Sequence, residues 1–486
     1  MTKTEIAVDK KAQLNAVSAI ESAHFDVREG KILAARAEAY ATGYEALTDE
    51  FRVTVKTVFS AVILLPDNAI DTQEEIVESV RSVFQKGING SAKAHFCVNV
   101  KNCVYSENGS EITADEIVDG WYIVEQKTEI LSPDHDLVCR VKKEKTNRID
   151  LYESRLDLSY TDEMRMPVKS VLDCSATAIV SAAYPSAGAV RVEGEITVRL
   201  IALSDNDQYL TQTFSHPFGT DVVANYADET TFDVECSVVK CAAALSDGDA
   251  REITTELETA FCLTTSTVAE IEMVTDCYSM EKETRATETV LVFDDRFCSR
   301  TLADKTSTVL AGNAVNEIYA CLYPTLREAK ARVEDGLTVE GTISSYVLYA
   351  DENDLPAVKE VRMPFSAHCN GDYDCSYVLF PTVAIKSCSA RLKTATDIEV
   401  SAEYAVTTRG VGEKTVRCVG EVALLEDKAP DDAAICLYPV KAGEDLFDVA
   451  KALNTREDVL LRLNPDLNLP LVGGEKILLY NELIED

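Results

Sequence analysis

The side chains that could do chemistry in this chain are its histidines, its cysteines and its many carboxylates. Of the 5 histidines, two stand beside cysteines, in the segments His95-Phe96-Cys97 and His368-Cys369. A structural zinc site usually separates its paired ligands by two to four residues. Because both pairs are closer than this, the sequence predicts no metal site and no other cofactor.

Carboxylates are so numerous, at 83, that a solvated acidic surface explains any pair of them better than acid–base catalysis does. The clusters at 204–208 and 350–355 lack the glycine and the distal glutamate of a calcium loop, so they are predicted to be hairpin tips. The chain has no phosphate-binding loop ending in Gly-Lys-Ser/Thr, no HExxH and no GxSxG. We therefore expect no enzymatic activity and no catalytic residues.

The net charge of −36, spread along the chain, repels phosphate backbones and anionic lipids. We expect no nucleic-acid partner and instead a basic surface on another protein. No run approaches the roughly 20 apolar residues of a membrane span, and the first residues lack a signal-peptide core. The sequence thus predicts no integral membrane segment and a cytoplasmic location. The 15 cysteines are then expected to be reduced, buried thiols, with disulfides or metal ligation as the alternatives.

Alternating apolar residues predict antiparallel β structure with one face buried, as in 190–203 and 337–350. The two runs also match each other, because each has a glycine that precedes a Pro-Phe pair by the same interval. Together with a looser third copy upstream, they indicate a unit of about 130 to 140 residues that occurs three times. We predict a mainly β chain of three consecutive antiparallel β-sandwich-like repeat domains, with bounds 1–160, 161–300 and 301–428.

The first domain is predicted to be divergent, because a helix near 72–87 replaces the Pro-Phe strand. Thr72 and Glu75 offer a capping box, and Gly87 offers a C-cap. The apolar stripe is expected to pack on its own domain, with a docking face for another protein as the alternative. The stripe consists of Ile76, Val80, Val83 and Phe84.

The periodicity changes in the last part of the chain, at 434–481. A short strand, two helical segments and a closing strand are expected there, with apolar residues at helical spacing in 446–453 and 459–463. Gly443 permits the turn into the first helix, Asp445 can accept hydrogen bonds from its free N–H groups, and Asn464-Pro465 ends the second helix. The sequence therefore predicts a separate small βααβ module.

These motifs resemble the LysM family, in which glycan lies in a shallow groove between the first and last loops. A LysM module commonly has a hydroxyl residue after Gly-Asp, whereas this chain has Gly443-Glu444-Asp445. Ionised carboxylates only accept hydrogen bonds, so a groove adapted to a protein is favoured over glycan binding or a purely structural module. The groove positions that the resemblance implies are Gly443, Glu444, Asp445, Leu446, Phe447, Asn464, Leu467, Leu471 and Val472.

The Val-Glu-Gly, Pro-Phe and Asp-x-Tyr-Ser motifs ahead of this module resemble the DUF3794 family, whose repeats precede a LysM module in clostridial spore-morphogenesis proteins. That resemblance implies a non-enzymatic scaffold of the endospore envelope. It would work in the mother-cell cytoplasm at the forespore surface and dock a SpoIVA-like ATPase of the coat basement layer through its LysM module. The alternative is a binder of peptidoglycan or chitin oligomers.

Overall fold

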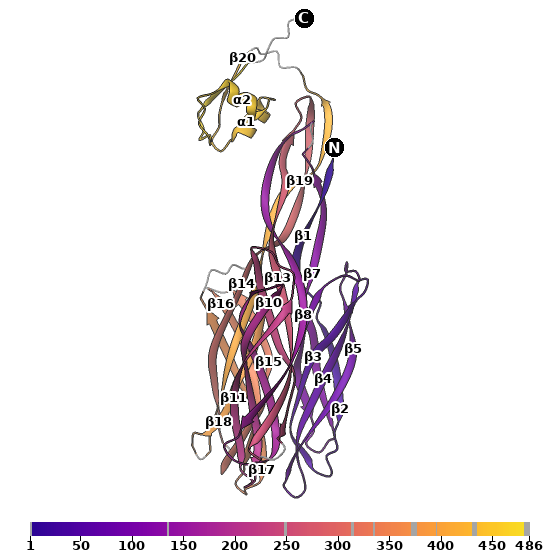
Figure 1. Ribbon diagram of the computed structural model, residues 1–486, viewed down its shortest axis with the longest axis vertical. Helices are drawn as coiled ribbons and strands as arrows, with labels where there is room; N and C mark the ends of the chain where they lie inside the picture. Colours follow the sequence, from indigo (N-terminus) through magenta and orange to yellow (C-terminus); the bar gives the residue numbers. More distant parts are fainter. Residues whose placement is uncertain are drawn as a thin grey trace.

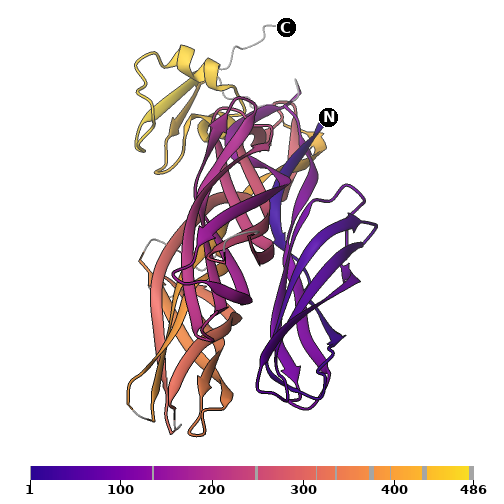
Figure 2. The ribbon, with the colours of Figure 1, turned by 60° about the horizontal axis from the view of Figure 1, so that its bottom comes forward.

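In the computed structural model, the chain is mainly β, and its strands pair in antiparallel sheets. The strands follow the longest axis of an elongated molecule, and the C-terminal module lies at the end opposite the hairpin tips (Figures 1 and 2). The mainly β, antiparallel prediction is therefore confirmed. The residues described by the structure are 2–133, 136–246, 250–312, 315–333, 336–370, 377–394, 396–429 and 435–480.

The first β unit consists of two sheets that face each other across a core including Ile32, Phe59 and Ile112. One sheet has the order β1-β7-β2 with β6 also on β7, and the other has the order β3-β4-β5. Alternating apolar residues on the central strands supply the buried faces. The strands are β1 (Lys3–Gln13), β2 (Val17–His24), β3 (Lys31–Ala46), β4 (Glu50–Leu64), β5 (Ile70–Phe84), β6 (Ala94–Tyr105) and β7 (Glu111–Leu131).

The second β unit packs sheet β11-β10-β9 against sheet β12-β13-β8 around a core that includes Ile196, Leu200 and Phe261. Most of the buried positions are β-branched or aromatic, which suits the two inner faces of a sandwich. The strands are β8 (Val138–Glu163), β9 (Val168–Ser186), β10 (Ala189–Ser204), β11 (Tyr209–Val223), β12 (Thr230–Leu245) and β13 (Glu252–Tyr278).

The third β unit has the same arrangement, with sheet β15-β16-β17 against sheet β14-β19-β18. The predicted boundaries at 160 and 300 fall inside β8 and β14, because these strands are 26 and 29 residues long and begin in a region shared by all units. The strands are β14 (Lys282–Leu310), β15 (Glu317–Val333), β16 (Leu337–Ala350), β17 (Pro356–Cys369), β18 (Tyr377–Leu392) and β19 (Ile398–Asp427).

The interval between the glycine and the Pro-Phe pair reflects a cross-strand contact. Gly194 on β10 lies opposite Phe218 on β11, and Gly341 on β16 lies opposite Phe365 on β17. A Cβ atom added to either glycine would approach the phenylalanine ring to 2.6 Å. A backbone carbonyl oxygen on the other neighbouring strand would be closer still, at 2.3 Å, so glycine is required at both positions by the ring and by the backbone together.

The predicted hairpin tips at 204–208 and 350–355 are confirmed, since they join β10 to β11 and β16 to β17. In the second tip, the Asp351 carboxylate accepts hydrogen bonds from the backbone N–H groups of Asn353 and Leu355 at 2.8 and 3.0 Å. This carboxylate orders the turn by a local Asx-type contact.

The predicted helix near 72–87 is wrong, because this segment is β5, an edge strand paired with β4. Ile76, Val80 and Phe84 lie on the outer face and are 56%, 61% and 68% exposed, whereas Val83 points inward and is buried. A spacing of four residues suits one face of a helix and also one face of a strand, whose period is two. The β-branched residues then decide in favour of the strand.

Because β5 is a strand, its neighbouring residues Val83 and Phe84 face opposite sides and should contribute unequally to stability. Val83→Ala is expected to lower the free energy of unfolding by about 1–2 kcal/mol, because it removes buried methyl groups. Phe84→Ala should change it by less than about 0.5 kcal/mol, because the ring is exposed. Urea denaturation of both variants measures the difference. Equal losses would contradict the strand, because a helix would bury both side chains on one face.

Apolar clusters join the three β units to one another. Residues of β3 and β4, of β9 and β10, and of β15 and β16 form a shared apolar core, and beyond it parts of β1, β7, β13, β14 and β19 pack around Phe293. These segments form the narrow part of the molecule next to the module (Figure 1). No helix among the described residues has the length and apolar character needed to cross a membrane. The shared core contains Leu33, Ala34, Val62, Leu64, Leu172, Ile201, Ala320, Leu322, Tyr323, Tyr346 and Leu348.

Candidate functional site

The C-terminal module is a two-stranded sheet with two helices on one face. The strands pair antiparallel, and Cys436 and Tyr438 on the first strand turn toward the helices. The core is formed by Val440, Leu446, Val449, Ala450, Leu460, Ile477 and Leu479. The elements are β20 (Ile435–Pro439), α1 (Leu446–Ala452), α2 (Glu457–Leu463) and β21 (Lys476–Tyr480).

The loop before α1 uses its carboxylates internally. Gly443 has φ +88°, a conformation that glycine adopts freely. The Asp445 carboxylate accepts the backbone N–H of Asp448 at 3.0 Å, and the Asp448 carboxylate accepts that of Asp445 at 3.1 Å. These reciprocal bonds cap two free N–H groups at the start of α1.

Glu444 is also engaged within the module. Its carboxylate accepts the backbone N–H of Lys441 at 2.8 Å and the hydroxyl of Tyr438 at 3.0 Å. The backbone hydrogen bond from Lys441 is the main reason why the pKa of Glu444 lies below its ordinary value. The charge at this loop is therefore stabilised locally.

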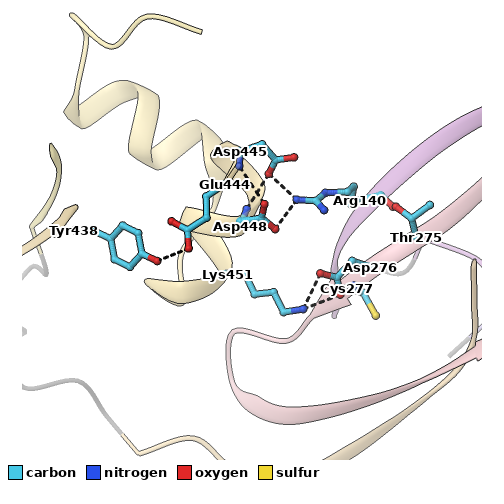
Figure 3. A network of polar contacts seen from close by, with 9 residues as sticks. All are labelled: Arg140, Thr275, Asp276, Cys277, Tyr438, Glu444, Asp445, Asp448 and Lys451. Carbon is cyan, nitrogen blue, oxygen red and sulfur yellow. Dashed lines mark hydrogen bonds and ion pairs between the residues drawn. The ribbon is translucent and has the colours of Figure 1, made fainter. Parts of the chain in front are cut away.

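One side of α1 is docked on the strands of the second β unit (Figure 3). Arg140 on β8 donates to Asp445 at 2.6 Å and to Asp448 at 2.8 Å, and Lys451 donates to Asp276 on β13 at 2.7 Å. Burial opposes ionisation of Asp448, but the hydrogen bonds from the Asp445 backbone and from Arg140 outweigh it and lower the pKa. These contacts orient α1 against the strand ends.

An aromatic contact lies beneath this polar network. The Phe447 ring is buried, with the Arg140 guanidinium 4.4 Å from its centroid and the Tyr278 ring 5.4 Å away. The Tyr278 hydroxyl donates to the carbonyl of Thr455, and Asn454 donates to the carbonyl of Met280 at 2.8 Å. Phe447 thus stabilises the docking of the module on its own chain.

The other predicted groove positions have different surroundings. Leu446 is buried, Leu467 and Leu471 are half-buried against the module core, and Val472 is 80% exposed. The Asn464 side chain donates to the carbonyls of Leu460 and Leu478 and accepts the N–H of Leu478, so it joins α2 to β21.

The two predicted loops do come together, since the N–H of Gly474 donates to the carbonyl of Val440 at 2.8 Å. An alanine Cβ at position 473 would lie 3.0 Å from Ala442 Cα. The structure therefore places Gly443 beside the loop that carries Val472.

The outer face of the small sheet was missed by the sequence interpretation. Ile435 lies opposite Tyr480, and Leu437 lies opposite Leu478. Ile435, Leu437 and Tyr480 are 61%, 55% and 50% exposed. The signal was available, because the strand 435–439 is apolar at consecutive positions and not only at alternate ones.

A second polar cluster joins His95 and Cys97 on β6 to Glu235 on β12. Burial would raise the pKa of Glu235, but the charge of His95 and its hydrogen bond lower it overall. For His95, burial lowers the pKa, while the neighbouring groups Cys262 and Glu235 raise it above its ordinary value. The spacing of His95 and Cys97 is too short for a typical zinc motif, so the sequence did not indicate this cluster. On a strand, however, residues two apart share a face.

The other histidines have separate surroundings. His216 lies 2.9 Å from Asp162 and stacks on Tyr160, and His368 contacts Thr338 and Asn370. His135 lies outside the described residues.

Comparison of the chain with protein-family models, with curated proteins and with solved structures found no match in any of the three. The function is therefore argued from the site itself.

Proposed function

We propose that this protein is a non-enzymatic scaffold of the endospore envelope, in which three DUF3794-type β repeats present a LysM-type module to a protein partner. As in a SipL-type adaptor, it would act in the mother-cell cytoplasm at the forespore surface and dock a SpoIVA-like ATPase of the coat basement layer. The observation that carries this proposal is the exposed apolar face of the module, formed by Ile435, Leu437 and Tyr480.

An apolar face with an aromatic residue suits a protein interface, where apolar and aromatic anchors provide most of the binding energy. The loop that would contact a sugar in a LysM groove offers few free hydrogen-bonding groups. Its carboxylates on Glu444 and Asp445 accept hydrogen bonds from Tyr438, Lys441 and the start of α1. Sugar hydroxyls would meet acceptors that are already occupied.

The β units support the scaffold part of the proposal. They are long antiparallel sheets that share a core, and the second and third use the same glycine-phenylalanine contact across neighbouring strands. A rigid body of this kind carries the module at one end of the molecule (Figure 2). The Arg140 network and Phe447 orient the module so that a partner meets a fixed surface.

Leu437→Asp in the full-length protein is the central test. It is expected to weaken binding to the purified coat ATPase by about tenfold or more, because it places a charge in the apolar face. Val223→Asp is the matched control, since Val223 is 81% exposed on β11, outside the module. Surface plasmon resonance measures both affinities.

The same protein is not expected to sediment with insoluble peptidoglycan. Retention that chitin oligomers compete away would overturn the proposal in favour of glycan binding. Unchanged affinity of Leu437→Asp for the ATPase would show that this face is not the interface.

A further inference from the structure

A cavity of about 560 Å³ lies where the three β units adjoin. Its lining includes β6 of the first unit, β12 and β13 of the second, and β18 and β19 of the third. The cluster of His95, Cys97 and Glu235 lines this cavity. The scaffold function proposed above does not use it.

His95 and Cys97 lie on the same face of β6. Ala94 and Phe96 are buried in the core of the first unit, so His95 and Cys97 project from the opposite face of the strand. Glu235 comes from the second unit, 140 positions later in the chain. The cluster therefore joins two units that share no sheet among the residues described by the structure.

The distances suit a transition metal. The ligand atoms of the three residues lie within 4.8 Å of one another, and His95 Nε2 is 3.5 Å from Glu235 Oε2. Tetrahedral zinc holds such nitrogen and oxygen ligands roughly 3.4 Å apart. The Cys97 sulfur would need to approach by at most about 1.2 Å, because zinc places sulfur and nitrogen ligands roughly 3.6 Å apart.

The surroundings orient the carboxylate. The Trp121 indole N–H donates to Glu235 Oε1 at 3.4 Å, which leaves Oε2 directed at His95. The nearby cations have their own partners: Arg409 donates to Asp233 at 2.8 Å, and Lys11 Nζ lies 3.9 Å from the Trp121 ring centroid. A hydrogen bond such as that from Trp121, which orients a ligand without contacting the metal, is typical of metal sites.

We propose that His95, Cys97 and Glu235 bind one zinc-class divalent ion, which links the first and second β units. Nitrogen, thiolate and carboxylate ligands together favour zinc over magnesium or calcium. The cavity leaves room for water at a fourth position. Binding removes the protons of the Cys97 thiol and of a protonated His95, so uptake releases protons to solvent.

Competition with a chromophoric chelator tests the proposal on the full-length protein after it has been stripped with EDTA. One zinc ion per chain is expected. Cys97→Ser and Glu235→Gln should each weaken binding by more than about 100-fold, beyond the loss that outer-sphere changes cause. Cys369→Ser is the matched control, because its neighbour His368 contacts Thr338 and Asn370 instead of this cluster.

Two further measurements use the unmodified chain, so they do not depend on a variant folding. Cobalt(II) should give a thiolate charge-transfer band and the visible bands of a tetrahedral ion, and zinc should raise the midpoint of thermal unfolding. Absence of the thiolate band, or zinc affinity unchanged by Cys97→Ser, would overturn the proposal and leave His95 and Glu235 as an ordinary ion pair.

Discussion

Asp173→Ala is expected to lower the free energy of unfolding by about 3–5 kcal/mol, because it leaves the buried Arg199 without its carboxylate partner and Arg36 with Glu38 alone. Asp173 on β9 lies 2.9 Å from Arg199 and 3.7 Å from Arg36. The three side chains are only 2%, 4% and 5% exposed. Solvent cannot replace the lost carboxylate at this depth.

This cluster also connects all three β units. Arg36 comes from β3, lies over the ring of Tyr323 on β15 at 4.8 Å, and reaches Asp173 of the second unit. Arg199 donates to the carbonyl of Cys321 on β15 at 2.7 Å. Loss of Asp173 should therefore loosen the junction as well as the second unit.

Urea denaturation followed by circular dichroism measures the effect as a shift of the first unfolding transition. Asp207→Ala is the matched control, because its ion pair with Lys169 spans 3.2 Å between side chains that are 74% and 61% exposed. Exposed pairs contribute about 0–1 kcal/mol. Equal shifts for the two variants would show that the buried cluster does not hold the junction.

The fold class could be predicted from the sequence, because alternation of apolar residues directly reports a strand with one buried face. The helices of the module also lie where the spacing of Leu446, Val449 and Leu460 places them. The segment of β5 could not be assigned from spacing alone. Its residues four apart fit both periods, and only its pairing with β4 separates them.

The site was harder to predict, because its contacts join distant parts of the chain. Arg140 meets Asp445 across 305 positions, and Glu235 meets Trp121 across 114 positions. No local pattern reports such contacts. Asp445 and Phe447 were therefore predicted as groove residues from the module alone, although the strands of the second unit are in contact with both.

Buried charge also makes the stability of this protein depend on pH at Asp294. This residue on β14 is 1% exposed, and burial raises its pKa from 3.8 to about 6 despite a 2.6 Å hydrogen bond from the backbone N–H of Lys11. Its other carboxylate oxygen has no hydrogen-bond partner among the described residues. Ionisation in the folded state is therefore unfavourable.

Asp294→Asn is expected to be more stable than the wild type at pH 7, by about 2–3 kcal/mol from the pKa difference. Between pH 4 and pH 6 the folded chain keeps the proton of Asp294 while the unfolded chain releases it, so this group lowers stability as pH rises. Below pH 4 both states are protonated, and the advantage of the variant should vanish. Urea midpoints at pH 4 and pH 7 measure the difference.

Asp150→Asn is the control for removing one surface carboxylate, because Asp150 is 50% exposed beside Lys93. An Asp294→Asn variant that is less stable than the wild type by the same amount at both pH values would contradict the prediction. It would mean that the hydrogen bond from Lys11, and not the cost of burying charge, determines the contribution of Asp294. Asp294 adjoins the apolar cluster around Phe293, where strands of all three units pack together. The expected result would therefore mean that this cluster is more stable in mild acid than at pH 7.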